Sequence, residues 1–140
     1  PVRGVMNIGL HIGIVCPSEA SARSGNRVTA DRWRRILMSL GHRAVTTRRY
    51  DGRPFDVLVV LHARKGAAAA AEFRAKHPDR ALIVALTGTD IYGRDDADRS
   101  MLRTLESADR LIALQAAAPQ RIAPQLRAKT AIIYQSASPP

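Results

Sequence analysis

The chain has little of several features that mark common classes of protein. It contains one cysteine, Cys16, so an internal disulfide and a four-cysteine zinc site are both excluded. Aromatic residues make up only 4% of the sequence, and stacking platforms for single-stranded nucleic acids are therefore scarce. No run approaches the ~20 apolar residues of a membrane-spanning helix, and Pro1 to Asn7 lack the apolar core of a signal peptide. We therefore expect a cytoplasmic protein with no membrane partner, no metal and no cofactor.

Acidic residues are also few relative to basic ones. The sequence has 22 lysines and arginines against 12 aspartates and glutamates, which gives a formal charge of +10. Such a charge suits an anionic partner, for example phosphate, a nucleotide or nucleic acid. Almost all the cations are arginines spread along the chain, whereas a nucleic-acid interface is recognised by a clustered basic face. Nucleic acid is therefore not the partner that we expect.

The length of 140 residues suits one domain with a substantial core. We assign residues 1–135 to this domain. Residues 136–140, with the sequence Ser-Ala-Ser-Pro-Pro, are typical of a linker that leaves a domain.

The hydrophobic pattern alternates between the periods of strands and helices. Trp33, Ile36, Leu37 and Leu40 have helical spacing, and Gly41 follows where a helix end favours a left-handed residue. This alternation predicts an α/β fold, a single Rossmann-like doubly wound parallel sheet of about six strands with helices on both faces. The expected strands are 8–15, 43–47, 55–61, 81–86, 111–114 and 131–134, and the expected helices are 27–40, 66–77, 101–108 and 116–126.

Polar clusters follow the expected strands. Because the carboxyl ends of parallel strands share one edge of the sheet, and open α/β sheets bind ligands there, these clusters mark a candidate site. The candidate binding residues are Gly25, Asn26, Arg27, Arg64, Lys65, Thr87, Gly88, Thr89, Gln135 and Ser136, and the candidate catalytic residues are His62 and Asp90.

Several of these side chains have a specific chemical interpretation. Free amides at the start of the first helix favour an anion, and Arg27 opposes the helix dipole there unless an anion lies nearby. An arginine fork and a lysine point charge at Arg64 and Lys65 suit a phosphate-like group. Asp90 offers a carboxylate that can orient a substrate or accept a proton. The alternatives are a solvated Arg27, a buried structural His62 and a helix-capping Asp90.

The single cysteine raises the possibility of a phosphatase. A low-molecular-weight phosphatase needs five residues between its nucleophilic cysteine and its arginine, but six separate Cys16 from Arg23. With one extra residue in the loop, the arginine would no longer face the phosphate group held by the cysteine. We therefore interpret Cys16 as a buried or loop thiol.

Six stretches of the chain also carry a family resemblance. They are Ser24 to Ala30 with Arg32 and Trp33, Leu40 to Arg43, Leu61 to Lys65, Leu86 to Tyr92, Ala108 to Gln115, and Tyr134 to Ala137. With these stretches the chain resembles the amino-terminal half of a GT-B glycosyltransferase of the selenosugar synthase family of selenoneine biosynthesis.

The resemblance implies a transferase that joins the anomeric carbon of a UDP-sugar, such as UDP-N-acetylglucosamine, to selenium from selenophosphate. It implies that the chain is the acceptor-side domain and that a carboxyl-terminal donor domain is its missing partner. We therefore expect these 140 residues to be inactive alone. Two alternatives remain, another phosphate- or nucleotide-binding α/β module and a basic nucleic-acid-binding domain.

Overall fold

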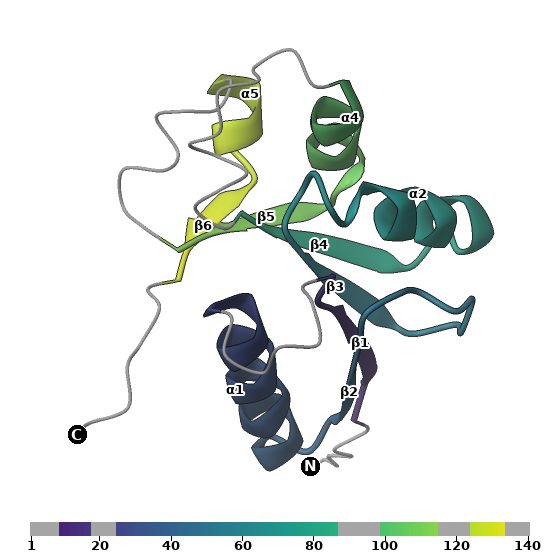
Figure 1. The fold of residues 1–140 in the computed structure, drawn as a ribbon, viewed down its shortest axis with the longest axis vertical. Coiled ribbons are helices and arrows are strands. Elements are labelled where there is room, and N and C mark those ends of the chain that lie inside the picture. The colour runs from purple at the N-terminus through teal and green to yellow at the C-terminus, as the bar shows by residue number, and fades with distance from the viewer. Residues whose placement is uncertain (1–8, 18–24, 87–98, 115–123, 134–140) are drawn as a thin grey trace, which may run out of the picture.

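A computed structural model describes residues 9–17, 25–86, 99–114 and 124–133 (Figure 1). The described residues form strands and helices in alternation, with short connections between them. In chain order the elements are β1 (His11–Val15), α1 (Gly25–Ser39), β2 (Arg43–Thr47), β3 (Val57–Leu61), α2 (Ala67–Lys76), β4 (Ala81–Leu86), α4 (Arg99–Ser107), β5 (Arg110–Ala113), α5 (Pro124–Arg127) and β6 (Thr130–Ile132).

The six strands form one sheet in the order β2-β1-β3-β4-β5-β6, and every neighbouring pair is parallel. Helix α1 lies on one side of the sheet, and α2 and α4 lie on the other (Figure 1). This arrangement confirms the predicted α/β, Rossmann-like fold. The parallel direction of all strands also puts their carboxyl ends on one edge.

Each face of the sheet has its own core. On the α1 face, Ile12, Ile14 and Leu61 are buried, and Trp33 and Leu37 of α1 pack against them. On the other face, the larger cluster includes Phe55, Phe73, Leu58, Leu82, Val84, Leu105 and Leu111. The inner strands β1, β3 and β4 are therefore mostly buried, which explains their nearly continuous apolar sequences, whereas the edge strands β2 and β6 are more exposed.

The observed boundaries differ from the expected ones by a few residues. Helix α1 begins two residues earlier than predicted, and Gly41 after its end has φ 95°, the left-handed conformation predicted for it. Strand β3 begins at Val57 because Phe55 closes a short turn on Arg53 instead. The ring of Phe55 is fully buried over Gly13, where a Cβ would lie 2.6 Å from it.

Two aspartates join neighbouring strands at the amino edge of the sheet. Asp56 Oδ2 accepts the His11 amide at 2.8 Å, and Asp109 Oδ2 accepts the Leu82 amide at 2.8 Å. Arg80 and Arg74 pair with these carboxylates at 2.9 and 2.8 Å. These polar groups hold the starts of neighbouring strands together. The starts of parallel strands form the amino edge of the sheet, which is opposite to the carboxyl edge that carries the candidate site.

Some predicted elements are described only in part. The expected helix 116–126 is described from residue 124 onward, as α5, and the strand expected at 131–134 is observed as Thr130–Ile132. Asp95, Asp96 and Asp98, which precede α4 in the sequence, lie outside the described residues. Within the described ranges, no helix has both the length and the apolar character needed to cross a bilayer.

Candidate functional site

The strand order changes direction between β1 and β3. From β1 the chain forms β2 on one side and then β3 on the other side of β1, and all later strands extend the sheet beyond β3. In doubly wound sheets the ligand crevice lies outside the carboxyl ends of the strands at this point. Here the segments that follow those ends are Cys16 and Pro17 after β1, residues 48–50 after β2, and residues 62–65 after β3.

The turn after β3 is held in an unusual conformation by His62. Its φ is 83°, a left-handed value that no other non-glycine residue adopts in the described part of the chain. Hydrogen bonds within the described chain hold it there. The His62 amide donates to the Ala85 carbonyl at 3.0 Å, Gly66 N–H donates to the His62 carbonyl at 2.8 Å, and Lys65 N–H donates to Nδ1 of the imidazole at 3.0 Å. Such strain costs about 1–3 kcal/mol and is concentrated at functional sites.

The imidazole of His62 is neutral at neutral pH. Its side chain is buried, with 3% of its surface exposed, and burial lowers its pKa from 6.5 to about 4, with further lowering by the charges of Lys65 and Arg64. Because Nδ1 accepts a hydrogen bond, the neutral ring carries its proton on Nε2. The ring is thus a hydrogen-bond donor through Nε2, and a base at Nδ1 would have to lose the Lys65 contact.

Gly66 allows this turn to lie directly on the sheet. A Cβ at this position would be 2.1 Å from Cγ1 of Val60 and 2.9 Å from the His62 carbonyl oxygen, and the side chain of Val60 is fully buried. Helix α2 begins at the next residue, without a side-chain cap. The turn therefore places two cations, Arg64 with a buried Nε and the exposed Lys65, beside the start of a helix.

A hollow of about 440 Å³ lies between the carboxyl ends of β1 and β2 and the start of α2. Lys65 is a predicted binding residue that lines it. The remaining lining residues are Val15, Pro17, Arg48, Arg49, Tyr50, Gly66, Ala68, Ala69 and Glu72. The residues that follow three neighbouring strands therefore meet in one cavity, as the parallel sheet predicts.

The hollow is positively charged. Among the described residues, the side chains of Arg48, Arg49 and Lys65 take part in no ion pair or hydrogen bond. The carboxylate among the described lining residues, Glu72, pairs with Lys76 at 3.5 Å. Cationic side chains without a protein counter-ion attract anions.

The start of α1 belongs to the other face of the sheet. Because α1 is joined to β2 by a short connection at the amino edge, its first turn lies toward the carboxyl edge. Arg27 Nε lies 4.0 Å from Asp31 Oδ2, so the cation that opposes the helix dipole has an ion-pair partner within the helix. A Cβ on Gly25 would meet no described atom within 4 Å. Residues 25–27 thus begin a helix on one side of the sheet, whereas the turn after β3 leads into α2 on the other side (Figure 1).

Cys16 is buried in the core. Its side chain is 3% exposed and belongs to the cluster on the α1 face, and its amide donates to the Thr47 carbonyl at 2.8 Å. This placement agrees with a structural thiol.

Other predicted residues lie outside the described part of the chain, so the structure neither groups nor separates them. They are Thr87, Gly88, Thr89, Asp90, Gln135 and Ser136. The prediction that they share a cleft with His62, Arg64 and Lys65 remains a prediction.

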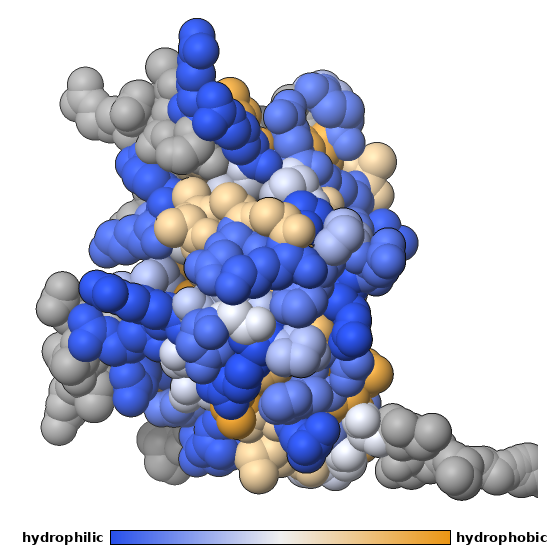
Figure 2. All heavy atoms as spheres, turned by 90° about the vertical axis from the view of Figure 1, so that its right-hand side faces the viewer, coloured by the Kyte–Doolittle hydropathy of each residue, from blue (hydrophilic) through white to orange (hydrophobic). Residues whose placement is uncertain are grey.

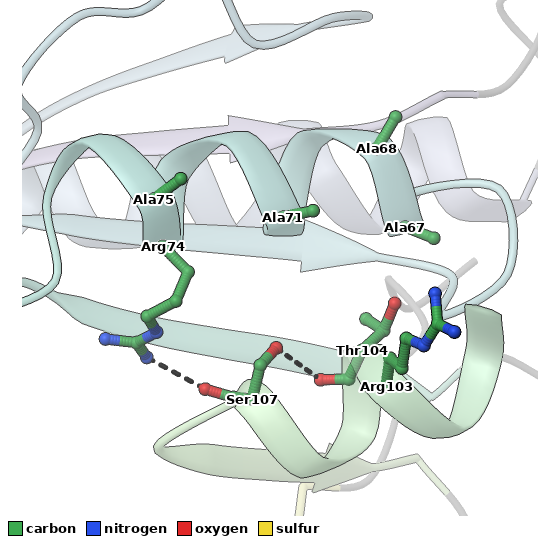
Figure 3. Close-up of a pocket in the computed structure, with 8 residues that line it drawn as sticks. All are labelled: Ala67, Ala68, Ala71, Arg74, Ala75, Arg103, Thr104 and Ser107. Atoms are coloured by element: carbon green, nitrogen blue, oxygen red, sulfur yellow. Dashed lines mark hydrogen bonds between the residues drawn. The ribbon is translucent and has the colours of Figure 1, made fainter. Parts of the chain in front are cut away.

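A second hollow, of about 520 Å³, lies between α2 and α4 (Figure 3). Four alanines of α2 form one wall, and Arg103, Thr104 and Ser107 of α4 form the other. Arg74 reaches across and donates to the Ser107 carbonyl at 2.9 Å. Figure 2 views this side of the molecule and shows an apolar band among mainly hydrophilic side chains. The groove runs along the outer surface of the two helices, from the first residues of α2 to Ala75, and it shares Ala68 with the first hollow.

Sequence reasoning missed Arg48 and Arg49. They directly follow β2, so the rule that located the cluster after β3 also applies to them. Tyr50 was also missed, and it contributes a buried wall whose hydroxyl donates to the Arg53 carbonyl at 2.6 Å. Within the described ranges, no group of three or more histidines, cysteines, aspartates or glutamates is arranged to hold a metal ion.

Fold and site together define an α/β protein with a doubly wound parallel sheet and a cationic crevice at its topological switch point. No protein-family model matches the chain, and no curated protein is significantly similar to it in sequence.

Proposed function

We propose that this domain is the acceptor side of a glycosyltransferase that joins a UDP-sugar to selenophosphate. In this reaction a bond forms between selenium and the anomeric carbon, the bond from that carbon to the oxygen of UDP breaks, and UDP leaves. Attack of water on phosphorus then breaks the selenium–phosphorus bond and releases phosphate and the selenosugar. The sequence resemblance suggests the reaction. The physical observation that supports it is the turn after β3, with its two cations and buried imidazole at the switch point.

The acceptor in this proposal is a small, multiply charged anion. Arg64 presents a planar fork and Lys65 a point charge, the two side-chain types that bind phosphate-like groups in complementary ways. His62 contributes a neutral Nε2–H donor instead of a third charge. The remaining residues that we predict to line the cleft are Gly25, Asn26, Arg27, Thr87, Gly88, Thr89, Asp90, Gln135 and Ser136.

The test is anaerobic titration of the chain with selenophosphate. The double variant Arg64→Ala/Lys65→Ala should keep the fold and weaken selenophosphate binding by at least about tenfold, because two charge-assisted contacts are lost. The control variant Arg34→Ala/Arg35→Ala removes the same charge from α1. Equal affinity of wild type and the Arg64/Lys65 variant would refute the site.

Transfer itself is tested with a donor domain present. We expect no selenosugar from the 140-residue chain with UDP-N-acetylglucosamine and selenophosphate, because a GT-B site needs walls from two domains. Addition of a donor domain should restore turnover. Selenosugar formation by the chain alone would contradict the proposal that acceptor and donor bind to separate domains.

A binding module without transfer is the second candidate, and the hollow lined by Arg48, Arg49 and Lys65 favours it. Phosphate-like anions would then bind with no gain when a donor domain is added. The same titration, repeated with and without that domain, separates the two functions.

A further inference from the structure

We infer that the hollow formed by Arg48, Arg49, Lys65 and the first turn of α2 is a binding pocket for a small organic phosphate. The ligand is a dianionic phosphate group joined to a compact neutral body. This inference rests on the second candidate function, whose ligand class it names, and it does not depend on glycosyl transfer, although Lys65 belongs to both proposed sites.

Charge is the first observation that supports the pocket. Three cationic side chains line the hollow, and no described hydrogen bond or ion pair occupies their charged groups. Some arginines elsewhere in the described chain have a carboxylate partner, as Arg53 has in Asp51 at 3.0 Å and Arg80 in Asp56 at 2.9 Å. The hollow therefore gathers cations that the fold does not use for its own stability.

Shape is the second observation. The volume of about 440 Å³ falls within the range of roughly 300–1,000 Å³ that small-molecule pockets occupy. Its walls also include apolar groups of Val15, Pro17, Ala68 and Ala69. A bare phosphate ion leaves these walls uncovered, whereas the body of an organic phosphate can lie against them.

The rigidity of the pocket is the third observation. Val15 is 1% exposed and Tyr50 is 7% exposed, and both belong to the core on the α2 face. Gly66 is fixed between Val60 and the His62 carbonyl. The cations therefore project from a wall that is already packed, so that little backbone ordering is needed on binding.

The experiment is calorimetric titration of the 140-residue chain with glucose 1-phosphate. Arg48→Ala/Arg49→Ala should weaken binding by at least about tenfold, because two charge-assisted contacts are removed. The matched control Arg34→Ala/Arg35→Ala lowers the net charge equally on the opposite face of the sheet and should change affinity less than about twofold. Equal losses in the two variants would show a general charge effect and overturn the pocket.

A second variant tests shape without changing charge. Ala68 is exposed, so Ala68→Leu should fold normally while its side chain fills part of the hollow. We expect glucose 1-phosphate to bind at least about tenfold more weakly to this variant, and inorganic phosphate to be less affected. Unchanged glucose 1-phosphate affinity in Ala68→Leu, or no binding to wild type below 10 mM, taken as a rough ceiling for a specific site, would overturn the inference.

The two proposals fail separately. Loss of glucose 1-phosphate binding in Arg48→Ala/Arg49→Ala, with selenophosphate affinity unchanged in Arg64→Ala/Lys65→Ala, keeps the organic-phosphate pocket and refutes the acceptor site. The reverse pattern keeps the acceptor site and refutes the pocket.

Discussion

His62 is the residue at which backbone, burial and charge meet. Its backbone is held in the left-handed region, and the burial of its ring and the charges of Lys65 and Arg64 both disfavour the protonated form. The hydrogen bond from Lys65 to Nδ1 fits only the neutral ring. The site therefore maintains an uncharged imidazole among positive charges. As a consequence, the free energy of unfolding should decrease as the pH falls.

We predict that His62 makes the fold sensitive to mild acid. Its pKa of about 4 in the folded protein lies below the ordinary 6.5, so the unfolded chain takes up the proton first as the pH falls. Stability is full above about pH 6.5 and falls toward pH 4, by up to about 1.4 kcal/mol per pH unit. Urea unfolding at pH 7.0, 6.0 and 5.0 measures the effect.

His62→Asn is the matching variant. Asparagine tolerates the left-handed region and can still accept the Lys65 amide, but it does not titrate. The variant should lose most of the pH dependence between pH 5 and 6.5. A wild-type stability that is flat over this interval would rule out the buried neutral ring.

We predict that Gly66 is required and that Gly25 is replaceable. A Cβ on Gly66 overlaps the buried Val60 side chain, so Gly66→Ala should lower the free energy of unfolding by about 2 kcal/mol or more. Gly25→Ala, in open space at the start of α1, should change it by less than about 0.5 kcal/mol. The midpoints of thermal unfolding of the two variants test this prediction. Equal midpoints would contradict the steric overlap between a Cβ at residue 66 and Val60.

The charged residues at the two edges of the sheet have different roles. At the amino edge, Asp109 and Asp56 each accept a hydrogen bond from a strand amide and each pair with an arginine. These charged groups therefore stabilise the fold. At the carboxyl edge, the cations of the hollow have no such partners in the described chain. Among the stretches of the resemblance, the one containing Asp109 therefore has a structural explanation.

We predict that Asp109 stabilises the fold without affecting anion binding. Burial alone would raise its pKa, but the hydrogen bonds from Arg74 and the Leu82 amide and the charge of Arg74 outweigh it and lower the pKa. Asp109→Ala leaves the Leu82 amide without its acceptor and should cost about 2 kcal/mol. Its stabilising effect is present above the ordinary carboxyl pKa and is lost in stronger acid, below the interval in which His62 acts.

Glu72→Ala is the control for Asp109→Ala. It removes an exposed helical ion pair with Lys76 and should cost less than about 0.5 kcal/mol. Urea unfolding at pH 7 compares the two variants. An equally small effect of Asp109→Ala would show that the amino-edge contacts do not stabilise the sheet.

At the scale of the whole molecule, one sheet separates two cores that share its strands. Trp33 packs on the α1 face, and Phe73 is fully buried on the α2 face. The same strands carry side chains for both cores. If the helices on one face unfold, the strands that also support the other core become exposed to water. We expect the chain to unfold as one cooperative unit.

Phe73→Leu tests this cooperativity. The cavity should lower stability by about 1–2 kcal/mol. Fluorescence of Trp33, the only tryptophan, reports on the opposite face, and its urea midpoint should shift by the same amount as the midpoint from far-UV circular dichroism. A fluorescence midpoint that does not move would show that the faces unfold independently.

The sequence by itself determined the alternation of elements and their parallel arrangement, because the periods of apolar residues and glycine signals such as Gly41 act locally along the chain. It also located the cation pair after β3, since strand ends can be read from the same pattern. Only the tertiary structure decided the strand order and the left-handed conformation of His62, and only it brought Arg48 and Arg49 to the start of α2. These features depend on which distant segments pack together, and that packing energy has no signature in any single stretch of sequence.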